Sequence, residues 1–296
     1  MKYRHTYHAG NFADVHKHVT LLALLRSLAR KEKGFLFLET HAGRGLYDLS
    51  SSEARKSEES NTGIIRIISA LTPPGTEFIS QSNSTTLPEE IKNYLTVVRN
   101  TRKDSHFRNA YPGSPIFALQ SMRNQDRAVF IESQHIEHKV LLETVRKHPR
   151  VTVECADGYE RLKTWLPPLE RRALVLIDPP YEDSQVDFKK TIVASAEILN
   201  RLPNAIIALW FPIKHERDSQ YWINQLSNNI AKPLLVSELW RYPRDNRVGL
   251  NGGGLIIINP PFQFSDRMRV WLPILHTALD PSPSQGGYEV RLLGVS

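Results

Sequence analysis

Residues 173–181 read Ala-Leu-Val-Leu-Ile-Asp-Pro-Pro-Tyr, five apolar residues followed directly by an acid, two prolines and a tyrosine. A short apolar run of this kind is typical of a strand that is buried in a parallel sheet. In open α/β sheets, ligands bind at the carboxyl ends of such strands. The stretch therefore predicts a buried strand over residues 173–177, with Asp178 facing a binding crevice.

Similar strands recur along the chain. Other short apolar and β-branched runs occupy residues 35–39, 127–132, 151–155, 205–211, 234–240 and 255–259. Segments with helical periodicity separate them, and a further helix over residues 14–31 precedes the first strand, with His18 on its apolar face. Alternating strands and helices predict an α/β fold with a Rossmann-like, mostly parallel sheet of seven strands.

One interval between strands is too long for a loop. The first two strands are about 85 residues apart, whereas the other intervals are roughly 20 to 30 residues. Helix-like segments at residues 63–71 and 88–102 lie inside this interval. We therefore predict a small helical insertion over residues 47–111, and a catalytic domain that comprises residues 1–46 and 112–296.

The Asp-Pro-Pro-Tyr stretch suits the binding of an exocyclic amine. The Asp178 carboxylate and the Pro179 carbonyl can each accept one of the two amine hydrogens. Because two acceptors pull these hydrogens out of the ring plane, they localise the nitrogen lone pair toward an electrophile. Tyr181 offers a ring on which a base can stack. Asp178 takes the departing proton or only orients the amine, and the sequence leaves both open.

A second stretch, Asn259, Pro260, Pro261 and Phe262, repeats this pattern after another apolar run. If the last strand of the sheet runs antiparallel, that stretch lies at the opposite edge of the sheet. We therefore assign the catalytic role to Asp178, although an asparagine would suit a glutamine side-chain amide as acceptor.

Acidic residues also follow the neighbouring strands. Glu132 ends the second strand, where a carboxylate can hold ribose hydroxyls, and Asp157 with Gly158 follows the third, where it can meet an adenine amine. After the first strand, Gly43 and Gly45 allow close approach of the backbone to a cofactor. Any one of these acids alone is more often an ordinary loop carboxylate. Their order together predicts a site for S-adenosylmethionine beside an amine acceptor.

The charge of the chain favours a polyanionic partner. The 296 residues carry 38 Lys and Arg against 31 Asp and Glu, a formal charge of +7. Basic clusters at residues 99–108 and 241–247 indicate RNA contact, with a solvated surface as the alternative. There is no apolar run of the length of a membrane helix, no signal peptide and one cysteine, so we expect a cytoplasmic monomer. His5 and His8 have a metal-like spacing without cysteine support, and we predict no metal.

Several motifs together resemble one known family. They are Tyr3-Arg4-His5, His8-Ala9-Gly10-Asn11, Asp14-Val15 with Lys17-His18, Thr40-His41-Ala42-Gly43, Tyr111-Pro112-Gly113-Ser114-Pro115, Ala156-Asp157-Gly158, Asp178-Pro179-Pro180-Tyr181 and Leu209-Trp210. They span nearly the whole chain, which resembles the bacterial 23S ribosomal RNA adenine-N6 methyltransferases of the RlmJ type. The resemblance implies a class I methyltransferase sheet of seven strands, S-adenosylmethionine as the methyl donor, and N6-methylation of one adenine in 23S rRNA.

The same resemblance implies roles for individual residues. The implied cofactor contacts are His18, His41, Ser114, Glu132, Asp157, Gly158 and Asp178. Asp178 would be the catalytic acceptor, supported by Pro179 and Tyr181, and we expect Tyr3, Arg4 and Lys17 to contact the RNA. The alternatives are a DNA adenine or protein-amide N-methyltransferase with the same motif, and a non-catalytic RNA-binding Rossmann domain.

Overall fold

The computed structural model of the chain describes residues 4–72, 78, 87–244, 246, 248–280 and 285–294. The strands are β1 (Leu36–Glu39), β2 (Leu46–Asp48), β3 (Ala110–Pro112), β4 (Arg127–Ile131), β5 (Val151–Glu154), β6 (Ala173–Ile177), β7 (Ile206–Ile213), β8 (Leu234–Trp240), β9 (Gly252–Ile258) and β10 (Gly287–Leu293). The helices are α1 (Phe12–Ala29), α2 (Ser52–Ser57), α3 (Ile64–Leu71), α4 (Glu89–Asp104), α5 (Ser114–Leu119), α6 (His135–Val145), α7 (Gly158–Trp165), α8 (Ser184–Arg201), α9 (Glu216–Asn229) and α10 (Phe264–Leu279), with short 3₁₀ turns at His5–Tyr7 and Glu59–Thr62. In the part of the chain that the structure describes, no helix is long and apolar enough to cross a membrane.

One large sheet organises the molecule. Its strand order is β10-β8-β9-β7-β6-β1-β4-β5, and the strands from β7 to β5 are all parallel. β9 runs antiparallel between β7 and β8, which confirms the predicted direction of that strand. Among the described residues the sheet has eight strands rather than the predicted seven, because β10 pairs antiparallel with β8. β10 is a half-exposed edge strand in which charged residues alternate with apolar ones, so it lacks the continuous apolar run of a central strand.

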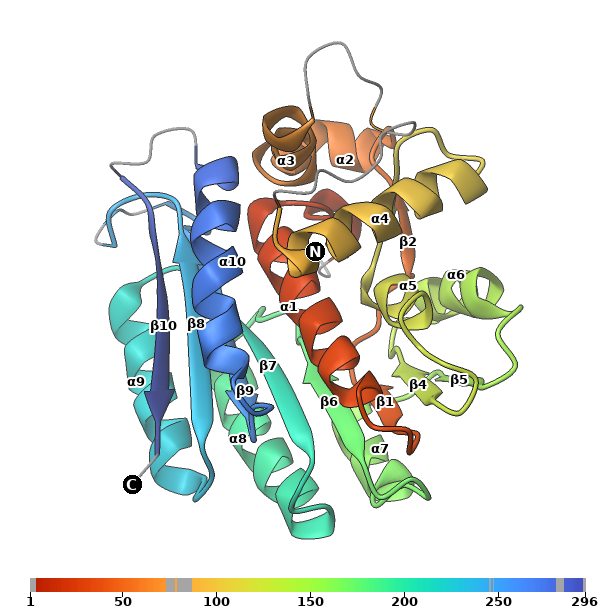
Figure 1. Ribbon diagram of the computed structural model, residues 1–296, viewed down its shortest axis with the longest axis vertical. Helices are drawn as coiled ribbons and strands as arrows, with labels where there is room; N and C mark the ends of the chain where they lie inside the picture. Colours follow the sequence, from red (N-terminus) through yellow and green to blue (C-terminus); the bar gives the residue numbers. More distant parts are fainter. Residues whose placement is uncertain are drawn as a thin grey trace.

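Helices cover both faces of the sheet (Figure 1). α7, α8 and α9 pack on one face around a core that includes Leu38, Val175 and Trp222. α1 and α10 pack on the other face around Phe37, Leu176 and Trp271. Because β1 and β6 are buried on both faces, the carboxyl ends of the parallel strands are held in one rigid row.

The segment between β2 and β3 carries α2, α3 and α4. β2 and β3 pair antiparallel, so the two ends of this segment lie side by side. α3 and α4 pack over α1 and α10, and their buried Ile67 and Tyr94 belong to the same core as α1 (Figure 1). Division of the chain into a catalytic domain and an insertion over residues 47–111 stays a prediction.

α1 is buried on every side over most of its length. The side chain of Asn11 caps its first turn by accepting a hydrogen bond from the backbone N–H of Asp14 (2.8 Å). The sheet, α4 and α5 pack around the helix, and all residues from Phe12 to Leu25 are buried. The expectation of a single apolar face was therefore incomplete, since Asp14, Lys17 and His18 all lie inside the protein.

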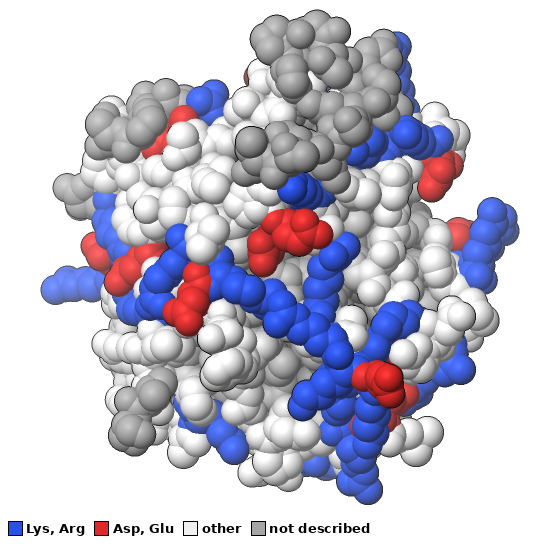
Figure 2. All heavy atoms as spheres, viewed as in Figure 1, with Lys and Arg blue, Asp and Glu red and all other residues white. Residues whose placement is uncertain are grey.

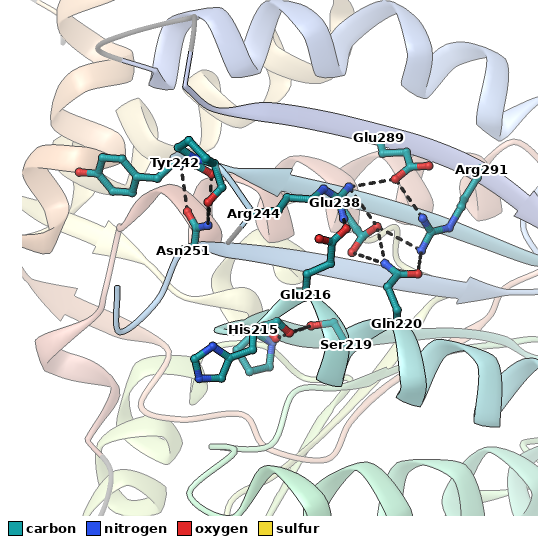
Figure 3. A network of polar contacts seen from close by, with 12 residues as sticks. His215, Glu216, Ser219, Gln220, Glu238, Tyr242, Arg244, Asn251, Glu289 and Arg291 are labelled. Carbon is teal, nitrogen blue, oxygen red and sulfur yellow. Dashed lines mark hydrogen bonds and ion pairs between the residues drawn. The ribbon is translucent and has the colours of Figure 1, made fainter. Parts of the chain in front are cut away.

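Arg244, one of the three arginines in the cluster predicted over residues 241–247, is paired within the protein and does not face RNA as predicted. Arg244 contacts the carboxylates of Glu216 (3.0 Å) and Glu289 (3.0 Å), and Arg291 contacts Glu238 (3.2 Å), as Figure 3 shows. Burial raises the pKa of Glu238, and the charges of Arg291 and Arg244 oppose this rise. This network ties β8, α9 and β10 together, and Arg247 lies outside the described residues.

The basic cluster at the end of α4 is also partly turned inward. The Arg99 Nε donates to the Phe78 carbonyl (3.0 Å), and the Arg102 Nε donates to the Ala110 carbonyl (3.3 Å). Both guanidinium groups lie over the Phe78 ring. These two arginines hold the chain around α4, so they do not form the RNA surface that the sequence predicts.

Candidate active site

Residues from the ends of three parallel strands line one pocket. His41 follows β1, Glu132 follows β4 and Asp178 follows β6. His18 of α1 and Ser114 of α5 reach the same pocket. The structure thus brings together five of the seven residues that were predicted to bind the cofactor.

A chain of charged side chains leads to Asp178. The Lys17 ammonium lies 2.6 Å from Asp178 Oδ2 and 2.9 Å from Asp14 Oδ1. The other carboxylate oxygen of Asp14 contacts His5 Nε2 (2.9 Å) and accepts the backbone N–H of Gly10 (2.9 Å). The Lys17 side chain, which comes from α1, therefore fixes the position of the Asp178 carboxylate.

Lys17 is an internal cation rather than the RNA contact that we predicted. Its exposed fraction is 4%. Burial alone would lower the pKa of Lys17, but the charges of Asp14 and Asp178 raise it well above its usual value. Burial likewise opposes ionisation of Asp14, while the charges of His5 and Lys17 hold its pKa well below the usual range. The Lys17 ammonium and the Asp14 carboxylate are therefore both ionised at neutral pH.

The Asp-Pro-Pro-Tyr turn is anchored by its tyrosine. Tyr181 has a positive φ of 51° and an exposed fraction of 2%. Its hydroxyl donates to the Trp210 carbonyl (2.5 Å), and its ring packs against Phe188 and Trp210. The structure corrects the predicted stacking role, because a ring enclosed in this way holds the turn and does not offer a free face to a base.

His18 is fixed as a neutral ring. Its Nδ1 shares a hydrogen bond with the Tyr111 hydroxyl (2.9 Å), and its ring stacks on Phe117 with 4.5 Å between centroids. Burial lowers the pKa of His18 well below its usual value. His41 is also kept neutral, because burial lowers its pKa to about 4. Neutral histidines can donate or accept hydrogen bonds in the pocket without adding positive charge.

Glu39, a buried carboxyl that contacts the pocket residue Ser114, was not predicted from the sequence. It is the last residue of β1, it is fully buried, and the Ser114 hydroxyl donates a hydrogen bond to its Oε1. Its Oε2 is buried without a hydrogen-bond partner among the described residues. Burial raises the pKa of Glu39 to about 8, against the opposing effects of Ser114 and Lys17. A charged residue that ends an otherwise apolar strand was the signal available in the sequence.

The raised pKa of Glu39 predicts a pH-dependent stability. The folded state holds the Glu39 proton up to about pH 8, whereas a carboxyl at the ordinary value of 4.5 releases it earlier. The stability contributed by the protonated group is therefore lost as pH rises from about 4.5 to about 8. We expect Glu39→Gln, which cannot ionise, to have a higher Tm than the wild type at pH 9 and a similar Tm at pH 5. Thermal melts between pH 5 and pH 9 measure this difference in Tm. An equal dependence of Tm on pH in the two proteins would contradict the prediction.

Glu132 organises the two loops beside it. Its carboxylate accepts the backbone N–H groups of Gly43 (2.9 Å) and Gln134 (2.7 Å). Burial raises its pKa, and these hydrogen bonds oppose that rise. Gly43 has φ +62°, and a Cβ there would meet the Tyr47 hydroxyl at 2.5 Å, so a side chain at this position would be strained.

Of four further predicted contacts, two lie outside the pocket, one lines it and one falls outside the described residues. Asp157 is exposed and outside the pocket, where it caps α7 by accepting the backbone N–H of Tyr159 (2.8 Å). Gly158 allows α7 to approach β1 closely, because a Cβ there would lie 2.1 Å from the Thr40 carbonyl oxygen. Arg4 lines the pocket, and Tyr3 lies outside the described residues.

Asn259 lies at the opposite edge of the sheet from Asp178. Its side-chain amide donates to the carbonyls of Pro203 (3.1 Å) and Ala205 (2.8 Å), just before β7. The second proline-rich turn therefore closes the far end of the sheet.

The strand order, with an antiparallel β9 inserted beside a parallel sheet and a pocket at the carboxyl ends, is that of a class I methyltransferase. The model of the family described as "Ribosomal RNA large subunit methyltransferase D, RlmJ" matches residues 32–293. The chain belongs to this family.

Individual relatives agree with this assignment. "Ribosomal RNA large subunit methyltransferase J" of Escherichia coli (strain K12) is 36% identical over 282 residues, and that of Haemophilus influenzae is 34% identical over 281 residues, each covering 95% of both chains. A crystal structure of a protein from Legionella pneumophila str. Philadelphia 1 superposes with a TM-score of 0.81 at 31% identity, covering 96% of this chain and 98% of that one.

Proposed function

We propose that this chain transfers a methyl group from S-adenosylmethionine to the N6 amine of an adenine in 23S ribosomal RNA. The observation that carries the proposal is the position of Asp178, which lines two adjoining pockets. One is the pocket of His41, Glu132 and Ser114. The other, of about 510 Å³, is lined by Trp210 and Lys214. A group between two pockets is placed to join a donor on one side to an acceptor on the other.

The chemistry of the first pocket fits S-adenosylmethionine. This cofactor carries a sulfonium and an ammonium, and when bound it supplies an electrophilic methyl group. Glu132, Glu137 and Asp178 give the pocket an acidic lining. Beside the pocket, Glu39 Oε2 is a buried polar atom without a hydrogen-bond partner among the described residues. Ser114 and Glu132 are the hydrogen-bonding groups best placed for the ribose and the amino-acid part of the cofactor.

On the other side, Asp178 would hold the adenine amine. Asp178 Oδ2 contacts the Lys17 ammonium. Asp178 Oδ1 has no hydrogen-bond partner among the described residues, so it is available for one hydrogen of the amine. The Pro179 carbonyl accepts the other. Because the Lys17 ammonium 2.6 Å away fixes the position of the carboxylate, we favour Asp178 as the group that orients the amine while solvent takes the proton after methyl transfer.

A groove at the opposite edge of the sheet suits the RNA backbone. It encloses about 590 Å³, and its cationic lining comes from Arg30, Lys31, Lys33, Arg171 and Arg172. Phe262, with an exposed fraction of 86%, offers a ring for base stacking. Figure 2 shows Lys and Arg gathered over this region, at the lower right beyond the C-terminal end of α1. This groove, rather than the two basic clusters expected from the sequence, is our main candidate surface for RNA.

We expect the pair Lys31→Glu and Lys33→Glu to weaken binding to 23S rRNA by about 10-fold or more at low salt, because each phosphate contact releases counterions. The slope of the logarithm of affinity against the logarithm of salt concentration should also become shallower. Filter binding at several salt concentrations measures both. The control pair, Lys163→Glu and Lys189→Glu, changes the net charge equally on another exposed face, and an equal loss in both pairs would refute the groove as a specific contact.

A substrate panel separates this function from the alternatives. The protein is incubated with labelled S-adenosylmethionine and, separately, with 23S rRNA, double-stranded DNA or total cell protein. We expect label in the rRNA alone. Label in DNA or protein would favour the alternative methyltransferases, and absence of label in all three would favour a non-catalytic RNA-binding domain.

A further inference from the structure

Three side chains with soft or borderline donor atoms meet outside the pocket of Asp178. They are His135 and His138 of α6 and Cys155, which follows β5. One ring nitrogen of each histidine and the sulfur all lie within 4.8 Å of one another. The Cys155 Sγ is 3.3 Å from His135 Nδ1.

The fold itself brings these residues together. His135 and His138 are three residues apart at the start of a helix, so they share one face. β4 and β5 are parallel neighbours, and Ile131 pairs with Glu154. Cys155 therefore leaves the sheet beside the first turn of α6, where both imidazoles lie.

This donor set is one that binds zinc. Zn²⁺ prefers thiolate and imidazole ligands, with a zinc–sulfur bond of about 2.3 Å and a zinc–nitrogen bond of about 2.0 Å. In tetrahedral geometry these bonds place the ligand atoms roughly 3.5 Å from one another. The observed 3.3 Å between sulfur and nitrogen is close to that spacing. His138 Nδ1 is buried without a hydrogen-bond partner among the described residues, so one ring nitrogen of this histidine has its bonding capacity unused.

We propose that His135, His138 and Cys155 bind one Zn²⁺ ion, with water as the fourth ligand. On binding, the Cys155 thiol releases its proton to solvent and the sulfur coordinates as a thiolate. The prediction of no metal rested on the spacing of His5 and His8, and it did not consider this cluster.

The ion would hold the loop that enters the methyltransferase pocket. His135 directly follows Gln134, whose backbone N–H donates to Glu132 (2.7 Å). Fixing the first turn of α6 therefore fixes the carboxylate that lines the pocket. The proposal itself stands on the three ligands and does not depend on the reaction.

Cobalt substitution tests the proposal on the full-length, untagged protein. Co²⁺ bound by a thiolate gives a sulfur-to-metal charge-transfer band in the near ultraviolet, which reports the cysteine directly. We expect one Co²⁺ per chain with this band, displaced by one equivalent of Zn²⁺. The band should disappear in Cys155→Ser, and Zn²⁺ affinity, measured by competition with a chromophoric chelator, should fall by at least about 100-fold in His135→Ala and His138→Ala.

The matched control is His148→Ala, an exposed histidine just beyond α6, which should bind Co²⁺ and Zn²⁺ as the wild type does. Absence of the band in the wild-type protein would overturn the proposal. So would a Zn²⁺ affinity that is unchanged in both His135→Ala and His138→Ala. Because the readout is metal binding, it is independent of whether the chain methylates RNA.

Discussion

Asp178→Ala should lower the rate of methyl transfer by at least about 100-fold, because the variant loses the acceptor that orients the adenine amine. The side chain of Asp178 is partly exposed at the junction of the two pockets, and Lys17 keeps its contact with Asp14 in the variant, so we expect the variant to fold. Single-turnover assays with labelled S-adenosylmethionine and 23S rRNA measure the rate, and calorimetry measures cofactor affinity.

The conservative variant Asp178→Asn distinguishes orientation from proton transfer. An amide oxygen still accepts one hydrogen of the amine, so an orienting role predicts a smaller loss than in Asp178→Ala. Equal losses in the two variants would favour a carboxylate that takes the proton. Full activity in Asp178→Ala would contradict the assigned mechanism.

Lys17→Met should destabilise the protein by about 3–5 kcal/mol, which is typical of removing one partner from a buried ionic group. The variant leaves the Asp14 carboxylate buried without the ammonium that lies 2.9 Å away. It also frees Asp178 from the contact that fixes it, so activity should fall even where the variant stays folded. Urea denaturation measures the free energy of unfolding.

A second substitution provides the control for Lys17. Asp14→Asn in the Lys17→Met background removes the uncompensated charge and should recover part of the lost stability. It should not recover activity, because Asp178 still lacks its cation. A loss below about 1 kcal/mol in Lys17→Met would mean that the ammonium is not held inside the protein as the structure has it.

The central part of the fold was predictable because its strands are continuous apolar runs. β6 was placed at its observed bounds, and β1, β4 and β5 to within one residue. β10 was not, because Glu289 and Arg291 face a polar network and no residue of this strand is fully buried. β2 and β3 are three residues each and depend on their mutual pairing across about 60 residues of chain, which periodicity does not show.

The site was predictable only where its residues follow strands. Glu132 and Asp178 were found from their order along the chain, and both line the pocket. The contact of Lys17 with Asp178 joins residues 161 positions apart, so it needs the tertiary structure. The burial of Tyr181 depends on a positive φ, which the residue type does not indicate.

Nucleoside analysis of the RNA product tests the proposed N6-methylation of adenine. 23S rRNA lacking the modification is incubated with the protein and S-adenosylmethionine, digested to nucleosides and separated by mass and retention. We expect N6-methyladenosine as the single new methylated nucleoside, formed by the wild type and lost in Asp178→Ala. A methyl group on another nucleoside or another atom of adenosine, or no methylated nucleoside at all, would contradict it.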